Sequence, residues 1–208
     1  MRAPARTTIT DVAPPLVVLS GPPGSGKTTL AVPLARALRL PLLAKDTVKE
    51  ALMSSLAVDT IERSRELGGA AYAVLFALAR SHLDAGAGLV LESNFARGVS
   101  EAELAPLVAR SRAVAVHCWA PPEVLLARYR ARAAERHPGH FDLDRLRAPV
   151  RWVEGPTTEP PELGIPCLRL DTSAGADLEP VVRWVRAHLR HRRRLSSKPP
   201  PCPGPGPC

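Results

Sequence analysis

Short apolar runs alternate with longer helical patterns over most of the chain. The apolar runs, which are typical of buried strands, cover residues 16–20, 41–44, 88–92, 113–119 and 167–170. Apolar residues at helical spacing predict helices over residues 27–39, 46–57, 63–85, 101–111 and 121–136, and a last one from residue 177 onward. Repeated β-then-α units imply an α/β fold, with a parallel sheet covered by helices on both faces.

Three parts of the chain differ in composition. We expect an N-terminal extension over residues 1–14, one domain over residues 15–190, and a tail over residues 191–208. The tail is basic at first and then rich in proline and glycine, which predicts disorder. Within the domain, residues 137–166 are rich in proline, glycine and charge, and we expect a long excursion there with little regular structure.

The most specific motif is a glycine-rich loop between the first strand and the first helix. Residues 21–28 read Gly-Pro-Pro-Gly-Ser-Gly-Lys-Thr and match the pattern G-x-x-x-x-G-K-[ST]. Glycines let the backbone turn its N–H groups inward, and the positive end of the following helix adds to the attraction for phosphate. The alternative to a phosphate-binding loop is a turn that only connects a strand to a helix. The candidate nucleotide-binding residues are Gly21, Gly24, Ser25, Gly26, Lys27, Thr28 and Thr29.

Two side chains of this loop have distinct expected roles. Lys27 is predicted to reach the β and γ phosphates of the nucleotide, and therefore to act in catalysis. Thr28 is predicted to offer its hydroxyl group to Mg²⁺. The motif therefore predicts ATP and Mg²⁺ as the cofactors.

The segment after the second strand carries the candidate acceptor residues. Asp46 follows that strand directly, where the open end of a parallel sheet collects functional groups, and it is our candidate catalytic base. Lys49 lies one helical turn later and is expected to contact the acceptor. Asp46 is alternatively an ordinary helix N-cap, with Glu50 close by to reinforce the turn.

The third strand ends in a second carboxylate. Glu92 is expected to belong to the Mg²⁺ shell or to the substrate site, although it is longer than the usual aspartate. An ordinary strand-end carboxylate is the alternative. Asn94 is a candidate acceptor contact.

Arginines recur on the helix that follows the fourth strand. Arg128, Arg132 and Arg136 lie at i, i+4 and i+8, on one helix face. An arginine fork suits phosphate, and we expect Arg128 and Arg132 to contact it during transfer. A solvated basic face is the alternative. His137 and His140 are interpreted as loop histidines without a metal.

The composition of the chain bears on its charge and on the cellular compartment that we expect. The net charge is +8, which favours anionic partners. Only four of the 28 basic residues are lysines, and three of these fall in the stretch from the glycine loop to the candidate acceptor residues. Cys118 and Cys167 are interpreted as small buried residues rather than ligands or disulfides, which favours a reduced, cytoplasmic setting. The short apolar run after Asp11 argues against a cleaved signal peptide, and no run is long enough for a membrane span.

Together these motifs resemble those of a known family. The glycine loop, Asp-x-x-Lys-Glu at residues 46–50, Leu-Glu-Ser-Asn-Phe at residues 91–95 and an arginine-bearing helix resemble the AAA_33-type P-loop kinases, relatives of zeta toxins, chloramphenicol phosphotransferase and polynucleotide kinase. The resemblance implies a three-layer P-loop NTPase with a five-stranded parallel sheet of order 2-3-1-4-5. It also implies an arginine-bearing lid over about residues 121–150, Asp46 as the acceptor-activating base, and Thr172 in a turn against the adenine.

The expected activity is therefore transfer of the γ-phosphoryl group of ATP to a hydroxyl group of a small molecule. Two alternatives stay open at this point. One is a polynucleotide 5′-hydroxyl kinase whose basic tail follows phosphates, although Lys49 stands where such kinases tend to have arginine. The other is an ATP-binding regulatory module that transfers no phosphate. The acceptor and the oligomeric state are left undetermined.

Overall fold

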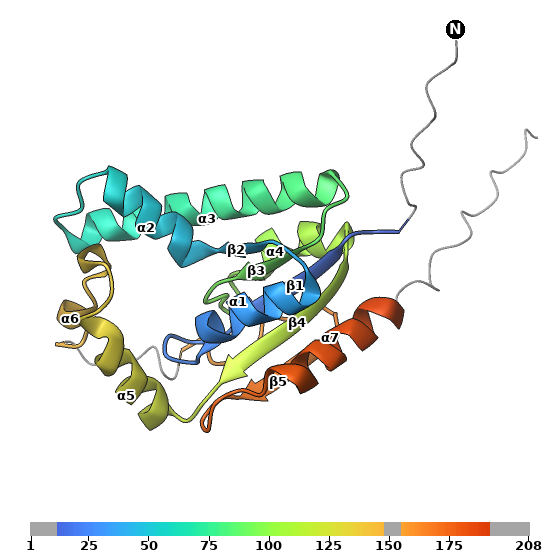
Figure 1. Cartoon of the computed structure of the whole chain (residues 1–208). Coiled ribbons are helices and arrows are strands. Elements are labelled where there is room, and N and C mark those ends of the chain that lie inside the picture. Colours follow the sequence, from blue (N-terminus) through green and yellow to red (C-terminus); the bar gives the residue numbers. More distant parts are fainter. Residues whose placement is uncertain (1–11, 148–154, 192–208) are drawn as a thin grey trace, which may run out of the picture.

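A computed structural model describes residues 12–147 and 155–191 of the chain. Strands and helices alternate along the sequence, as the apolar pattern predicts (Figure 1). The strands are β1 (Pro15–Ser20), β2 (Leu42–Ala44), β3 (Leu89–Glu92), β4 (Arg112–Trp119) and β5 (Cys167–Asp171). The longer helices are α1 (Lys27–Leu38), α2 (Lys45–Ser55), α3 (Ile61–Asp84), α4 (Glu101–Ala109), α5 (Pro122–Ala133) and α7 (Leu178–His191).

All five strands run parallel in one sheet of order β2-β3-β1-β4-β5, which confirms the expected topology. The register decides what gathers at the carboxyl end of the sheet. Glu92, the last residue of β3, lies opposite Leu19 of β1 on one side and Ala44 of β2 on the other. It therefore stands between the glycine loop, which begins at Gly21, and the start of α2.

Two apolar cores, one on each face of the sheet, give the fold its three layers. Alternate strand residues point to opposite faces, so neighbouring residues of β1 serve different cores. Val17 and Leu19 pack with α1 and α7, whereas Leu16 and Val18 pack with α3 and α4. All four of these side chains are fully buried, and their burial holds β1 and the loop that follows it in place.

The segment after α5 has little regular structure in its described residues, as expected. A 3₁₀ turn, η1 (Pro138–His140), and a short helix, α6 (Asp142–Arg145), lie within it. Helix α5 itself ends at Ala133 rather than near Arg136, because Pro138 cannot continue a helix and forces His137 into an extended conformation. Figure 1 shows α5 and α6 crossing from the end of β4 toward α2.

Two further sequence interpretations need correction. Cys167 is exposed, not buried, because β5 is the last strand of the sheet and nothing pairs with its outer side in the described residues; Cys118 is buried as expected. Asp46 is not the N-cap of α2, which is Ala44, but lies inside the first helical turn.

The proposed extension and tail fall almost wholly outside the described residues, so those boundaries stay predictions. None of the described helices is long and apolar enough to cross a membrane.

Candidate functional site

The glycine loop at residues 21–28 has the shape of a phosphate cradle. Gly21, Gly24 and Gly26 all have positive φ angles, of 143°, 82° and 74°, which glycine adopts without strain. The loop also lies too close to its neighbours for side chains: a Cβ at Gly21 would approach the Cys118 carbonyl oxygen to 2.3 Å, and one at Gly24 would approach the Leu125 carbonyl oxygen to 2.5 Å. Glycine is therefore required at 21 and 24 by both conformation and space, and at 26 by conformation.

The interior of the cradle is polar and fits an anion. The Ser25 hydroxyl group is buried and has no hydrogen-bond partner among the described residues. Lys27 is almost fully buried, and its ammonium group donates to the Pro22 carbonyl oxygen over 3.3 Å. Burial lowers the pKa of Lys27, while the negative charges of Glu92 and Asp46 oppose that change. A buried cation in a glycine-rich turn at a helix N-terminus is the arrangement that binds nucleotide phosphates.

Glu92 and Thr28 form a neighbouring pair of oxygen donors. Glu92 is buried, and burial raises the pKa of its carboxyl group, whereas Lys27 and a hydrogen bond from the Thr28 side chain lower it. Oxygen ligands of this kind suit Mg²⁺, so the two residues fit the predicted metal position. Within residues 12–147 and 155–191, no cluster of three or more histidine, cysteine or acidic residues could hold a metal ion.

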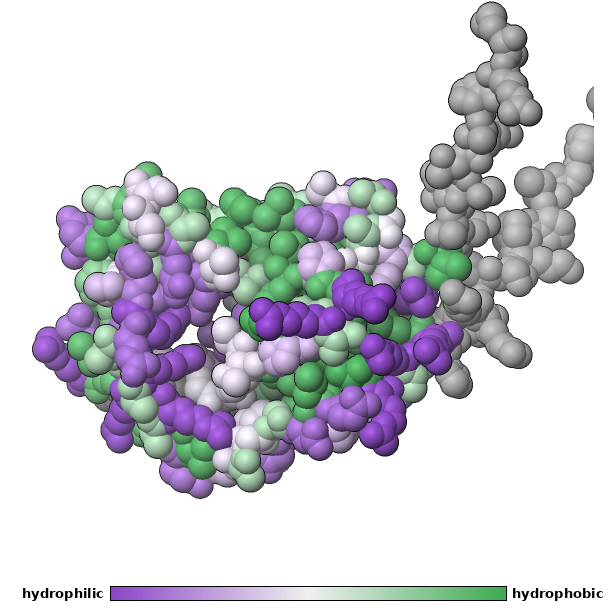
Figure 2. Space-filling model, in the orientation of Figure 1, coloured by the Kyte–Doolittle hydropathy of each residue, from purple (hydrophilic) through white to green (hydrophobic). Residues whose placement is uncertain are grey.

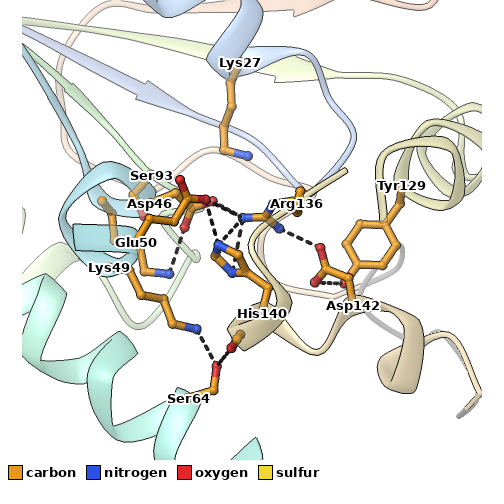
Figure 3. A network of polar contacts seen from close by, with 12 residues as sticks. Lys27, Asp46, Lys49, Glu50, Ser64, Ser93, Tyr129, Arg136, His140 and Asp142 are labelled. Atoms are coloured by element: carbon orange, nitrogen blue, oxygen red, sulfur yellow. Dashed lines mark hydrogen bonds and ion pairs between the residues drawn. The ribbon is translucent and has the colours of Figure 1, made fainter. Parts of the chain in front are cut away.

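Asp46 lies at the same end of the sheet, and Figure 3 shows Lys27 pointing toward it. Its carboxylate accepts hydrogen bonds from Lys45 over 3.0 Å and from Arg136 over 2.7 Å. Burial by itself would raise the pKa of Asp46, but these two cations, with help from Lys27, hold that pKa well below its ordinary value. The carboxylate is therefore ionised and can accept a hydrogen bond from an incoming hydroxyl group.

Lys49 points in another direction. Its ammonium group donates to the Ser64 hydroxyl group over 2.8 Å, and that hydroxyl donates to the Gly139 carbonyl oxygen over 2.6 Å (Figure 3). These two hydrogen bonds join α2, α3 and η1. Lys49 thus connects three elements beside the site, and its predicted contact with the acceptor stays a prediction.

Arg128 and Thr172 meet on the other side of the glycine loop. Arg128 donates to the carbonyl oxygens of Thr172 and Ser173 over 2.7 and 2.9 Å, and the Thr172 hydroxyl group donates to the Ser25 carbonyl oxygen over 2.9 Å. Both residues border a cavity of about 440 Å³ that opens beside the loop. Its other lining residues are Gly26, Thr29, Leu30, Pro33, Gly175, Ala176 and Leu178.

Arg132 comes from the same helix as Arg128 but faces the phosphate side. Its Nε atom is buried and has no hydrogen-bond partner in the part of the chain that the structure describes, and its guanidinium group lies 5.5 Å from the ring centre of Tyr129. Burial lowers the pKa of Arg132, and the nearby charge of Arg136 adds to that. Asn94 is half-buried just beyond β3.

The structure adds residues that sequence reasoning did not select. Arg136 contacts Asp46 and also donates to Asp142 over 2.8 Å, and His140 lies 2.9 Å from Glu50 (Figure 3). The ninety positions between Arg136 and Asp46 leave no local pattern that could have revealed the contact. The one available signal was the i, i+4, i+8 spacing of the three arginines, but Arg136 lies beyond the end of α5 and the spacing did not show what it contacts.

Comparison with known proteins agrees with this site. The family model described as an AAA domain, AAA_33, matches residues 16–156, which is more than half of the chain. The chain belongs to this family. The matched range includes the glycine loop, Asp46, Glu92 and the whole of α5.

Solved structures show the same fold. A candidate kinase from Chloroflexus aurantiacus J-10-fl is 35% identical, with a TM-score of 0.74 over 85% of this chain and 98% of that one. The APS kinase CysC of Mycobacterium tuberculosis, solved with AMPPNP and APS, is 18% identical, with a TM-score of 0.58 over 86% of this chain and 99% of that one. The fold is that of P-loop kinases.

A curated relative matches over a shorter stretch. A cytidylate kinase from Pyrobaculum neutrophilum is 42% identical over 50 residues, which are 24% of this chain and 27% of the relative. The chain thus matches only about a quarter of that relative's length.

Proposed function

We propose that the protein is an ATP-dependent kinase that transfers the γ-phosphoryl group to a hydroxyl group of a small molecule. The observation that supports this most is the placement of an ionised carboxylate, Asp46, opposite Lys27 of the phosphate cradle. A regulatory nucleotide-binding module needs no such group beside an open acceptor position. The likeness to P-loop kinases agrees with the proposal.

In the proposed reaction the cradle and Lys27 hold the β and γ phosphates, and the nucleoside enters the cavity that Arg128 and Thr172 border. The acceptor's hydroxyl oxygen bonds to the γ-phosphorus as the bond to the β–γ bridging oxygen breaks. The hydroxyl proton passes to Asp46, and ADP leaves with the electron pair. Thr28 and Glu92 would hold Mg²⁺, which supplies positive charge to the phosphates when bound.

The α5–α6 segment, residues 122–145, is proposed to act as the lid of this kinase. It brings Arg132 and Arg136 to the edge of the phosphate and acceptor positions. Arg132 would stabilise the charge that develops on the transferred group, since its buried Nε has no hydrogen-bond partner among the described residues and so has a donor to offer.

Two variants test the proposal. Lys27→Ala should lose Mg·ATP binding, whereas Asp46→Asn should keep it and lose about 10²- to 10⁴-fold in transfer rate, as expected for a general base. Transfer of labelled γ-phosphate is measured against nucleosides, sugars, aminoglycosides, chloramphenicol and 5′-hydroxyl oligonucleotides. Asp84→Asn is the control, because it removes only an exposed ion pair with Arg110 at the far end of α3. Parent-level transfer by Asp46→Asn would refute the base assignment.

A further inference from the structure

The charged side chains on the acceptor side of the site are not equally accessible. Asp46 and Glu50 lie one helical turn apart on α2, so both face the α5–α6 segment. Their side chains are 40% and 42% exposed, whereas those of Lys45 and Arg136 are each 17% exposed. Lys49 is almost fully buried. An incoming molecule therefore meets carboxylate oxygens before it meets cations.

These cations are also engaged with groups of the protein. Lys45 donates to Asp46, Arg136 donates to both Asp46 and Asp142, and Lys49 donates to Ser64. With Arg132 assigned to the transferred phosphoryl group, an acidic acceptor would have to break one of these contacts and approach two carboxylates. Like charges at such short range disfavour binding, so the arrangement selects against phosphate esters and carboxylic acids.

The two carboxylates are held in fixed positions but can still accept further hydrogen bonds. Each oxygen of Asp46 accepts one hydrogen bond, and Glu50 Oε1 accepts one from His140 over 2.9 Å. Every carboxylate oxygen can accept two, so the pair can still receive hydroxyl or ammonium donors. Figure 2 shows hydrophilic side chains around a hollow on this side of the molecule, between α2 and α5 of Figure 1.

We propose that Asp46 and Glu50 together bind the acceptor, and that the acceptor is a neutral or amine-bearing polyol rather than an acid or a phosphate ester. This inference rests on the kinase function proposed above. Asp46 takes the proton of the reacting hydroxyl group. Glu50 accepts a hydrogen bond from a second hydroxyl or ammonium group of the same molecule and so determines which hydroxyl faces the γ-phosphate.

The experiment compares acceptors in matched pairs, with the full chain and labelled ATP. The pairs are ribose and ribose 5-phosphate, cytidine and cytidine monophosphate, glucose and gluconate, and glucosamine and glucosamine 6-phosphate; a 5′-hydroxyl oligonucleotide is added. We expect the uncharged or amine-bearing member to be preferred at least about tenfold in kcat/KM, because the acid meets unfavourable charge.

Glu50→Gln tests the second carboxylate. The amide keeps an oxygen for His140 but loses the charge, so we expect the KM for the preferred acceptor to rise about tenfold while Mg·ATP affinity stays at the parent value. If Glu50 only held η1 in place, this KM would not change. Glu66→Gln is the control, because Glu66 is an exposed carboxylate on α3 that pairs with Arg63.

The possible failures are distinguishable. Preference for the acidic member or for the oligonucleotide would overturn the acceptor class and leave the kinase function standing. Transfer to no member of the panel, with Mg·ATP binding intact, would also count against this acceptor class. A Glu50→Gln variant with unchanged KM would remove Glu50 from the site. Absence of Mg·ATP binding by the parent would instead refute the proposed function, and this inference with it.

Discussion

Arg136 donates from Nη2 to Asp46 Oδ2 over 2.7 Å, although ninety positions separate the two residues. Its second amino group, Nη1, donates to Asp142 Oδ2 over 2.8 Å, and the Tyr129 hydroxyl group donates to the other oxygen of Asp142 over 2.6 Å. The guanidinium group is therefore fixed between two carboxylates. Its position fixes that of Asp46, the proposed base, from the opposite side of the site.

Arg136→Gln should reduce kcat by up to about 100-fold, because Asp46 is then free to leave its productive position. The variant should also move the acid limb of the pH–rate profile. Removing a cation raises the pKa of Asp46, so the base becomes protonated, and activity is lost, at a higher pH than in the parent.

Kinetics from pH 3 to 8 would test both effects, because the pKa of Asp46 in the parent lies below that of an ordinary aspartate. Arg136→Lys is the matched variant. It keeps the charge but cannot span both carboxylates, so it should restore the pH profile more than the rate. An Arg136→Gln variant with the kcat and pH profile of the parent would show that Arg136 does not act on Asp46.

Gly24→Ala should abolish nucleotide binding. Gly24 has a φ angle of 82°, and a Cβ there would lie 2.5 Å from the Leu125 carbonyl oxygen, so the cradle must distort. Gly98→Ala is the control, since Gly98 has a φ angle of 75° but a Cβ added there would meet no atom within 4 Å. Both should lose about 1–2 kcal/mol of stability from backbone strain. Titration with a fluorescent ATP analogue would separate them, and equal affinities would contradict the argument.

Ser64→Ala should destabilise the fold by about 1–3 kcal/mol, because the Gly139 carbonyl oxygen and the Lys49 ammonium group each lose a buried partner. Urea unfolding measures the change. Ser54→Ala is the control: the Ser54 hydroxyl group donates to the Glu50 carbonyl oxygen on the exposed side of α2, and its loss should cost less than about 0.5 kcal/mol. Similar values for the two variants would show that the link through Ser64 contributes little.

The sheet and the phosphate loop were predictable because their signals are local. Buried strands of a parallel sheet appear as continuous apolar runs, and the glycine loop requires glycine at fixed spacing for reasons of conformation and space. The strand order itself came from the family resemblance, since no local pattern specifies which strands become neighbours. It is confirmed by the pairing of β3 with both β1 and β2.

The acceptor side was less predictable because its contacts join distant segments. The spacing predicted Arg136 on the helix face of Arg128 and Arg132, whereas Arg136 lies beyond the end of α5 and its partner Asp46 belongs to another element. The exposure of Cys167 depends on the position of β5 at the sheet edge, which an apolar run cannot reveal. The proposed role of Glu50 depends on which of the side chains around it are buried and which are exposed. Only the packed structure shows these exposures.

His117 makes the stability of the protein depend on pH. Its ring is fully buried in β4; Nε2 lies 3.0 Å from the Thr158 carbonyl oxygen and Nδ1 lies 2.9 Å from the Ser20 hydroxyl group. A carbonyl oxygen only accepts, so Nε2 carries the proton, and the neutral ring can accept from Ser20 at Nδ1. Burial lowers the pKa of His117, although the hydrogen bond to Thr158 opposes this.

The sign of the effect follows from proton binding. The unfolded chain takes up a proton at this histidine near pH 6.5, whereas the folded chain does so only at lower pH. The unfolded state therefore binds more protons below about pH 6.5, and the free energy of unfolding falls as the pH drops through that range. His117→Gln keeps a donor and an acceptor but cannot titrate. Urea unfolding between pH 7 and 5 should thus show a shallower decline for His117→Gln than for the parent or for a variant of the half-exposed His82, and parallel declines would contradict the assignment.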